Sequence, residues 1–512
     1  MDPCRANEGL VVLLGAGPGD PDLITAAGLK WLSRADVIVY DRLVPQALLS
    51  LAPASAERLY VGKTPGAKSI SQQQINDLLV ARARAGKLVV RLKGGDPLIF
   101  GRGGEEAEAL AAAGAAFRIV PGITAGVAAA AAAGIPLTDR RAASTVAFVT
   151  AREDPGKGRS AINWQGLAGI DTLVVYMGVA ALPAVAERLI AAGRSPTTPA
   201  AAVEQAATAR QRTVVATLGT IAERAQAAGL APPAVVIVGQ VVRMRDQLAW
   251  LERLPLFGQT VILTRPQQQA ADLAGRLGEL GAEAIEAPVI EIRPPESLAA
   301  LDEALGRLGE FDWLVLTSPN GAAAVLDRLA ALELDARALA GVRIAAVGAA
   351  TADALRKRSI RPDLLPQAFT TEALGRALAA GGAIKGRRVL LARSEIATDA
   401  LAAALQQAGA VVEAVVAYRT VRPEVLPAEA VEALRDRRVD WLTFTSASTV
   451  ENFLALLAPH AVDLSQAKLA AIGPVTAKAL RSRGLTATVV AEPHTVDGLV
   501  AAIVSFQAGG RS

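Results

Sequence analysis

Short runs of valine, isoleucine and leucine alternate with alanine-rich stretches throughout the chain. In the first half the apolar runs lie at 11–14, 37–40, 88–92, 146–150, 173–177 and 235–238. Continuous apolar runs of this length are typical of strands buried on both faces of a sheet, with helices in the stretches between them. The pattern therefore predicts an α/β protein.

This pattern restarts near residue 258. The segment Leu254–Gly258 separates the first half from a new apolar run at 260–263. A chain of 512 residues exceeds what one hydrophobic core usually organises. We therefore expect separate domains, with a short linker at 253–257.

The second half contains an internal duplication. Three pairs of segments match: 258–265 with 386–393, 311–313 with 439–441, and 345–348 with 470–473. The first two pairs have the same spacing, and in the third the segments lie a few residues closer together. The duplication predicts two similar α/β lobes.

Each repeat also carries a hydroxyl-rich turn directly after an apolar run. The turns are Thr317–Gly321 and Thr445–Thr449. Such a turn can simply cap the helix that follows, or it can offer N–H and hydroxyl donors to an anion. The residues alone leave both interpretations open, and two matched turns facing one cleft would favour ligand binding.

Charge and composition argue against several classes of protein. Lys and Arg number 53 against 49 Asp and Glu, and the net charge of +4 is weak for a nucleic-acid-binding protein. Cys4 is the single cysteine, so no disulfide forms within the chain and a reducing compartment is expected. His460 and His494 both lie in the second half. We expect no metal.

The longest apolar run, Ile119–Leu137, could be mistaken for a membrane span. Pro121 and Pro136 bracket it, glycines interrupt it, and it is dominated by alanine. These features favour a close-packed buried helix instead. The start of the chain lacks the pattern of a signal peptide. We therefore expect a cytoplasmic protein that binds no membrane.

Glycines at alternate positions follow the first apolar run, at 15, 17 and 19. Glycine lets the backbone approach a ligand closely, so the loop predicts a site for a nucleoside-bearing cofactor. A dinucleotide-binding loop would have the spacing Gly-x-Gly-x-x-Gly and open a helix at once. Here Pro18 breaks that spacing, and Asp20-Pro21 delays the helix to about Leu23. The loop argues against a dehydrogenase.

Residues 9–252 resemble uroporphyrinogen-III C-methyltransferase, of the tetrapyrrole methylase family that uses S-adenosylmethionine. The matching segments run through the whole half: 15–20, 35–42, 61–63, Arg91-Leu-Lys-Gly-Gly-Asp-Pro97, Phe100-Gly-Arg-Gly-Gly-Glu105, 120–125, 176–178 and 238–239. The resemblance implies a fold of two α/β subdomains and a homodimer formed through this half.

The same resemblance implies roles for individual residues. Asp41 would accept a proton and Lys63 would donate one; taken alone, Asp41 reads as a helix cap and Lys63 as a solvated charge. Methylation of a pyrrole carbon leaves a cationic ring, which a nearby carboxylate can stabilise and deprotonate. S-adenosylmethionine would be bound by Pro18, Gly94, Gly95, Asp96, Ile99, Thr124, Ala125, Met177 and Ala206.

The substrate of this family is an octa-acid, so arginines that bind carboxylates are expected. The candidates are Arg42, Arg102, Arg140, Arg141 and Arg152. The chain also departs from the family pattern. Asp139 and Arg152 stand where histidines are usual, and Ala206 replaces a glycine that usually meets the cofactor.

Residues 258 to about 505 resemble uroporphyrinogen-III synthase, a fold of two α/β lobes with an open cleft. The matching segments are 264–266, 317–321, 346–348, 417–420, 444–446, 472–476 and 494–495. The resemblance implies one lobe from about 258–290 with 420–505 and another from 295–415. The crossovers 287–293 and 415–422 would form a hinge.

The reaction implied for this half is cyclisation of hydroxymethylbilane with inversion of the last pyrrole. Positioning would provide much of the catalysis. We expect Tyr418 to assist departure of the hydroxyl group, although a tyrosine in a hinge strand is often simply packed. Candidate carboxylate binders are Arg265, Ser318, Arg393, Ser446, Thr476 and Thr495.

The two resemblances support each other, because the product of the second half is the substrate of the first. They imply a bifunctional enzyme that makes uroporphyrinogen III and methylates it twice, giving precorrin-2 for sirohaem or cobalamin. The alternative is a methylase of a different tetrapyrrole step whose second half is a non-catalytic tetrapyrrole sensor.

Overall fold

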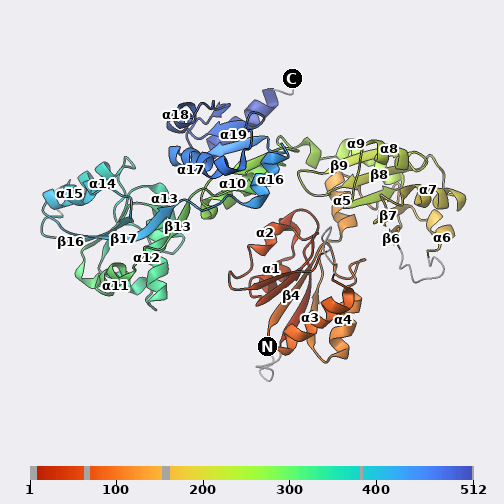
Figure 1. Cartoon of the computed structure of the whole chain (residues 1–512), viewed down its shortest axis with the longest axis horizontal. Coiled ribbons are helices and arrows are strands. Elements are labelled where there is room, and N and C mark those ends of the chain that lie inside the picture. The colour runs from red at the N-terminus through yellow and green to blue at the C-terminus, as the bar shows by residue number, and fades with distance from the viewer. Residues whose placement is uncertain (1–8, 63–69, 153–161, 381–383, 510–512) are drawn as a thin grey trace. The chain divides into compact units, whose positions relative to one another are not determined.

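The computed structural model describes residues 9–62, 70–152, 162–380 and 384–509. The chain divides into two compact units near residue 260 (Figure 1), with 276–283 and the C-terminal end grouped with the first. Among the described residues, strands form four five-stranded sheets. The α/β fold class expected from the sequence is confirmed.

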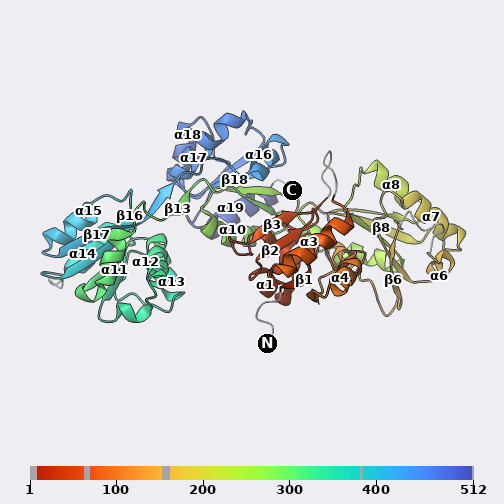
Figure 2. The same ribbon diagram turned by 60° about the horizontal axis from the view of Figure 1, so that its bottom comes forward.

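The first sheet is entirely parallel and has the order β3-β2-β4-β1-β5. Its strands are β1 Leu10–Gly15, β2 Val37–Tyr40, β3 Glu57–Tyr60, β4 Leu88–Lys93 and β5 Ala116–Val120. Val12 and Leu14 face α1 (Ala26–Leu32) and α2 (Gln46–Leu49). Val11 and Leu13 face α3 (Gln72–Arg84) and α4 (Gly103–Ala112), which lie side by side (Figures 1 and 2). Helices thus cover both faces.

The first helix begins later than the sequence predicts. Pro21–Leu23 forms a single 3-10 turn capped by the Asp20 carboxylate. Ile24 is extended, and α1 begins at Ala26 with the Thr25 hydroxyl as its cap. The expectation of a helix from about Leu23 was wrong because a second capping residue follows the first.

The second sheet is mixed and has the order β6-β7-β10-β8-β9. Only β6 and β7 are parallel neighbours; the other pairs are antiparallel. The strands are β6 Val146–Thr150, β7 Thr172–Tyr176, β8 Pro199–Glu204, β9 Arg212–Thr217 and β10 Ala234–Val238. The helices are α5 Ala125–Ala133, α6 Trp164–Ala168, α7 Leu182–Ala191, α8 Ile221–Ala227 and α9 Arg245–Leu248.

The alanine-rich run that resembles a membrane span forms α5, a helix of nine residues. Six of these residues are buried, and they pack against β7, β8 and β10. Alanine allows this close approach because its side chain is a single methyl group. The buried helix is confirmed, and within the described residues no helix is long and apolar enough to cross a membrane.

The second half contains two further sheets, with the orders β12-β11-β18-β19-β20 and β13-β17-β16-β14-β15. The strands are β11 Thr260–Leu263, β12 Glu283–Glu286, β13 Glu291–Arg293, β14 Trp313–Leu316, β15 Arg343–Ala346, β16 Arg388–Ser394, β17 Val411–Val421, β18 Trp441–Phe444, β19 Lys468–Ala471 and β20 Val489–Val490. The helices are α10 Gln267–Glu279, α11 Ala299–Gly306, α12 Pro319–Ala331, α13 Ala349–Arg356, α14 Thr371–Ala379, α15 Ala400–Gln407, α16 Ala428–Arg435, α17 Ala447–Leu457, α18 Pro474–Ser482 and α19 Val496–Gly509.

The internal duplication is confirmed in the strand order and in the register. The run β11-β18-β19 of one sheet repeats as β16-β14-β15 in the other. Trp441 pairs with Val261, and its counterpart Trp313 pairs with Val389. A cation lies over each tryptophan ring, Lys468 at 5.3 Å and Arg343 at 4.2 Å from the centroid. The two sheets are therefore variants of one design.

The two crossover segments predicted as a hinge meet as strands. β13 pairs with the end of β17 in antiparallel register, with Ile292 opposite Thr420. β17 is eleven residues long: its first part pairs with β16, and only its end pairs with β13. The hinge itself stays a prediction.

Phe453 offers a test of the core beneath β18. Its ring packs edge-on against Phe444 at 5.5 Å, and both side chains are fully buried. Phe453→Ala should lower the free energy of unfolding of the second unit by about 3–5 kcal/mol, because it leaves a cavity. Denaturant unfolding measures this, with the exposed Val425→Ala as a control expected to change it by less than about 0.5 kcal/mol. Equal effects would contradict this account of the core.

Candidate functional site

Three loops meet at the carboxyl edge of the first sheet, after β1, β2 and β4. These strands are neighbours in the order β2-β4-β1, and ligands of parallel sheets bind at such edges. The Gly17 N–H donates to the Gly95 carbonyl at 3.2 Å, and the Gly95 N–H donates back at 2.9 Å. The two glycine loops predicted to serve one cofactor are thus joined directly.

Glycine is required in these loops by close backbone approach. A Cβ on Gly15 would lie 2.5 Å from the Gly122 Cα, and one on Gly122 would lie 2.3 Å from the Gly95 carbonyl oxygen. Gly95 also has a φ of +74°, a conformation that residues with a side chain rarely adopt. The Asp96 carboxylate accepts from the Gly122 N–H at 2.9 Å and fixes the third segment in place.

A cavity of about 590 Å³ opens beside these loops. This volume lies within the usual range for small-molecule sites, about 300–1,000 Å³. Six of the residues predicted to bind the cofactor line it: Pro18, Gly94, Gly95, Ala125, Met177 and Ala206. The other three lie close to this lining. Asp96 accepts a hydrogen bond from the backbone N–H of Gly122, and the Thr124 hydroxyl contacts the hydroxyl of Tyr176. Ile99 packs against the apolar cluster around α5.

Tyr176 also lines this cavity, although it was not predicted from the sequence as a site residue. Its hydroxyl lies 2.7 Å from the Thr124 hydroxyl and accepts the Gly126 N–H at 2.7 Å. It therefore ties β7 to the first turn of α5. Burial is the main cause that raises the pKa of Tyr176, and the hydrogen bonds from Thr124 and Gly126 oppose it.

Backbone strain gathers around the same cavity. Met177 and Gln205 line it with φ values of +54° and +46°, and Ala207 has +59°. Such conformations cost roughly 1–3 kcal/mol each and persist where the surroundings enforce them. Ala206, which replaces a family glycine, thus lies between two strained residues.

Asp41 lies directly after β2 and is about a quarter exposed. One carboxylate oxygen accepts the Leu43 N–H at 3.1 Å, and the other lies 3.4 Å from Nη2 of Arg91. The carboxylate thus closes a local turn and also belongs to an ion pair. Lys63, the predicted proton donor, lies outside the described residues.

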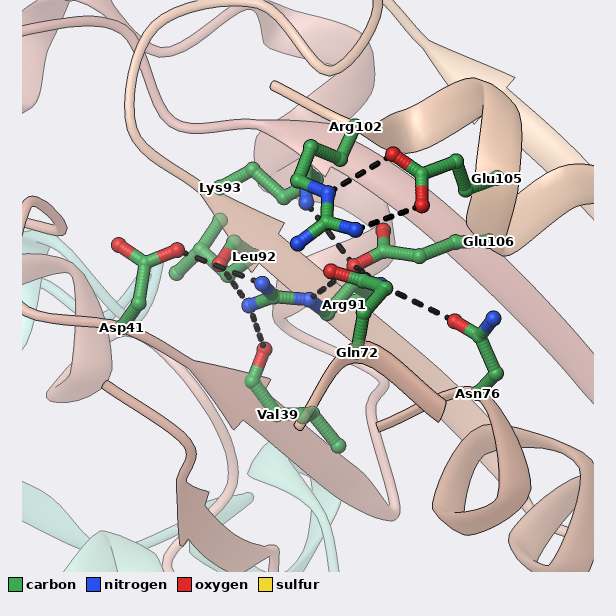
Figure 3. A network of polar contacts seen from close by, with 10 residues as sticks. All are labelled: Val39, Asp41, Gln72, Asn76, Arg91, Leu92, Lys93, Arg102, Glu105 and Glu106. Carbon is green, nitrogen blue, oxygen red and sulfur yellow. Dashed lines mark hydrogen bonds and ion pairs between the residues drawn. The ribbon is translucent and has the colours of Figure 1, made fainter. Parts of the chain in front are cut away.

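Behind Asp41 lies a buried network of charges (Figure 3). Arg91 and Lys93 of β4 both contact Oε1 of Glu106 on α4, at 3.1 and 3.0 Å. Gln72 of α3 donates to the same oxygen at 3.3 Å. Burial is the largest cause that lowers the pKa of Lys93; Arg91 lowers it further and Glu106 raises it.

The sequence of β4 contains a signal for this network. Arg91 and Lys93 alternate with apolar residues in a strand of a buried sheet, so both side chains point to one face. Buried cations require a partner, and that face is covered by α3 and α4. An acidic residue on one of these helices was therefore to be expected, and Glu106 is that residue.

The candidate substrate arginines have different surroundings. Arg42 lines the cavity. Arg102 forms a bidentate pair with Glu105, with both distances 2.7 Å. Asp139, which stands in place of a family histidine, pairs with Arg141 at 3.1 Å. Arg152 donates its backbone N–H to the Thr150 hydroxyl, and for Arg140 the structure offers no specific role.

In the second unit, four predicted residues follow β11, β18, β19 and β20 at the carboxyl edge of one sheet. Ser446 and Thr495 use their hydroxyls to accept N–H groups at the starts of α17 and α19. Thr476 is buried within α18. Arg265 is partly buried, which lowers its pKa, and its Nη2 donates to Gln269. Helix capping therefore accounts for the hydrogen bonds of two of these four residues, Ser446 and Thr495.

The other sheet brings two predicted residues together. The hydroxyls of Tyr418 and Ser318 lie 2.9 Å apart, and the Ser318 hydroxyl also accepts the Gly321 N–H at the start of α12. Arg393 points elsewhere: it contacts the carbonyls of Ala397 and Thr398 and pairs with Asp399 at 2.7 Å. Within the described part of the chain, no group of side chains is arranged to hold a metal ion.

Comparisons with known proteins match both halves. Family models match for Tetrapyrrole (Corrin/Porphyrin) Methylases at residues 10–222 and for Uroporphyrinogen-III synthase HemD at 271–501. The porphyrin biosynthesis protein HemD of Ruminiclostridium josui is 37% identical over 98% of this chain and 99% of its own length. The uroporphyrinogen-III C-methyltransferase of Priestia megaterium is 51% identical over 46% of this chain and 98% of its own. A Thermus thermophilus uroporphyrin-III C-methyl transferase solved with S-adenyl homocysteine is 42% identical and covers 46% of this chain and 94% of its own, with a TM-score of 0.40. Both resemblances seen in the sequence are confirmed.

Tyr176 gives a test of the cavity wall. Tyr176→Phe should lower the free energy of unfolding of the first unit by about 1–3 kcal/mol, because the Gly126 N–H and Thr124 lose a partner. Since the folded-state pKa lies above the reference value of 10.0, this contribution is present below pH 10 and is lost as pH rises through the folded-state value. Denaturant unfolding and phenolate absorbance measure both effects. The exposed Tyr60→Phe is the control, and a similar loss there would contradict the assignment.

Proposed function

Since the chain belongs to the porphyrin biosynthesis proteins that join a tetrapyrrole methylase to a uroporphyrinogen-III synthase, we propose that it catalyses two consecutive reactions. The second half converts hydroxymethylbilane to uroporphyrinogen III. The first half transfers two methyl groups from S-adenosylmethionine to that product, giving precorrin-2. The observation that carries the first assignment is the cavity at the joined glycine loops, beside Asp41.

The cavity suits a nucleoside-bearing methyl donor. It is lined by glycine backbone and by the apolar side chains of Pro18, Leu43 and Val203, with few charged groups. Gly94 and Gly95 leave room for close approach of a ligand to the main chain. When bound, S-adenosylmethionine would supply an electrophilic methyl group. Pro18, Ala125 and Ala206 would hold it and keep water away from that group.

The protein's own groups then manage charge and protons. A pyrrole carbon that receives a methyl group leaves the ring cationic, and the ring must lose a proton. Asp41 is partly exposed and paired on its inner side with Arg91, so its carboxylate can face the ring and accept that proton. Arg42 lines the cavity and is available to bind a substrate carboxylate.

For the second half the hydroxyl pair Ser318–Tyr418 supports the proposal. Loss of water from hydroxymethylbilane leaves a stabilised cation, and a phenol can assist the departing hydroxyl by hydrogen bonding. The Ser318 hydroxyl lies at the first turn of α12 and holds the Tyr418 hydroxyl in place. Folding of the linear substrate so that a substituted ring carbon is attacked is a positioning effect. We also propose that the protein is a homodimer.

The first test supplies purified protein with fresh hydroxymethylbilane, with and without S-adenosylmethionine. Without the methyl donor we expect type III uroporphyrin after oxidation of the product. With the methyl donor we expect a doubly methylated product. Chromatography and mass spectrometry identify both. Formation of the type I isomer alone would exclude the synthase assignment. It would also leave the second half as a tetrapyrrole sensor, the alternative that the sequence raised.

Two variants separate the two activities. Asp41→Asn should lower the rate of methylation of supplied uroporphyrinogen III about 10²–10⁴-fold, the usual contribution of a general base, and leave cyclisation unchanged. Tyr418→Phe should lower cyclisation about tenfold or more and leave methylation unchanged. Each variant is the control for the other in the same two assays. Loss of both activities in either variant would point to misfolding rather than to these roles.

A further inference from the structure

Glu106 is a buried carboxylate with an unusual set of partners. It is fully buried, and its Oε1 receives three donors: Nε of Arg91, Nζ of Lys93 and Nε2 of Gln72. Its Oε2 is buried without a hydrogen-bond partner. A carboxylate in such surroundings is costly to bury unless nearby cations compensate it. Arg91 and Lys93 supply that compensation, so what remains to be explained is why Arg91 contacts a second carboxylate on its other side.

Arg91 connects Glu106 to the candidate base. Its Nε contacts Glu106 at 3.1 Å, and its Nη2 contacts Asp41 at 3.4 Å. Its Nη1 donates to the carbonyls of Val39 and Leu92 at 3.3 and 3.1 Å. The guanidinium is planar and rigid, so these contacts fix its orientation, and Figure 3 shows it between the two carboxylates.

The charges around Asp41 balance only when Glu106 is counted. Arg91 and Lys93 of β4 contribute two positive charges, and Asp41 and Glu106 contribute two negative ones. From α3 the neutral side chains of Gln72 and Asn76 complete the network. Arg102 and Glu105 pair with each other in the upper part of Figure 3. Without Glu106, two buried cations would favour the charged form of Asp41 and oppose its protonation.

We propose that Glu106 is a positioning residue for methyl transfer: it holds Arg91 against Asp41 and offsets the charge of Arg91 and Lys93, so that Asp41 can take up the proton. This rests on the proposed role of Asp41 in the first half. Glu106 is not one of the residues that line the cavity, and it acts on Asp41 through Arg91, which contacts both carboxylates.

The test compares Glu106→Gln, which removes the charge and keeps the shape, with Glu106→Asp, which keeps the charge. We expect Glu106→Gln to lower kcat for methylation about 10- to 100-fold, with KM for S-adenosylmethionine changed less than about threefold. The acid-side fall of kcat/KM should move to lower pH by about one unit, because the weakened base stays ionised further into acid. Glu106→Asp should recover part of kcat and restore the pH profile.

The control is Glu57→Gln, which removes a carboxylate from the half-exposed pair of Glu57 with Arg82 at the edge of the same sheet. Neither its methylation rate nor its pH profile should change. Cyclisation by the second half should be unaffected in every variant. A stability loss in Glu106→Gln with a normal pH profile and kcat would overturn the proposal and leave Glu106 with a structural role only.

A second measurement does not depend on methylation. Melting temperatures of Glu106→Gln, Asp41→Asn and the double variant report whether the two residues are coupled. We expect the loss caused by Asp41→Asn to be larger in the Glu106→Gln background, where Arg91 and Lys93 lack their other anion. Additive losses would overturn the proposal. If the unaltered protein fails to methylate uroporphyrinogen III while the losses are non-additive, the proposed function fails and the coupling stands.

Discussion

The carboxyl edge of the first sheet depends on three backbone segments that approach too closely to leave room for a Cβ. Gly15, Gly95 and Gly122 lie against one another, and paired N–H donors between Gly17 and Gly95 fix their separation. Because this contact is made by main chain, it sets where β1, β4 and the start of α5 meet. The cavity, its strained neighbours and the carboxylate after β2 all take their positions from that junction.

The second constraint is electrostatic, and it follows from the same strand. β4 carries the Gly94-Gly95 loop at its end and two cations, Arg91 and Lys93, on the face under α3 and α4. A parallel sheet buried on both faces gives these cations no water, so a carboxylate within reach is obligatory. Glu106 of α4 is that carboxylate, and Arg91, which pairs with it, also pairs with Asp41. Backbone that lines the cavity and the charged side chains thus belong to one strand and the loop that follows it.

Much of the fold can be predicted from the sequence, because short continuous runs of valine, isoleucine and leucine are typical of strands in a buried sheet. The six apolar runs of the first half are all strands. β8 was not predicted, because Pro199–Glu204 is mostly alanine, a poor strand former, and its completely buried place between β10 and β9 decides its structure. The glycine loops and Asp41 could be found from spacing and resemblance. Tyr176 could not, since its role depends on how β7 meets the start of α5. For Glu106, the two cations of β4 predict an acidic partner, but the sequence does not say which helix supplies it.

The two lobes of the second half share a strand order but differ in one polar contact. Their central strands share the same order and register, and each places a serine at the start of a helix, Ser318 before α12 and Ser446 before α17. Ser318 lies beside the hydroxyl of Tyr418, the only tyrosine in the second half. Ser446 instead contacts the hydroxyl of Ser448. The helix cap is therefore present in both lobes, and the phenol in β17 gives one lobe a hydroxyl pair for which the other has no equivalent tyrosine.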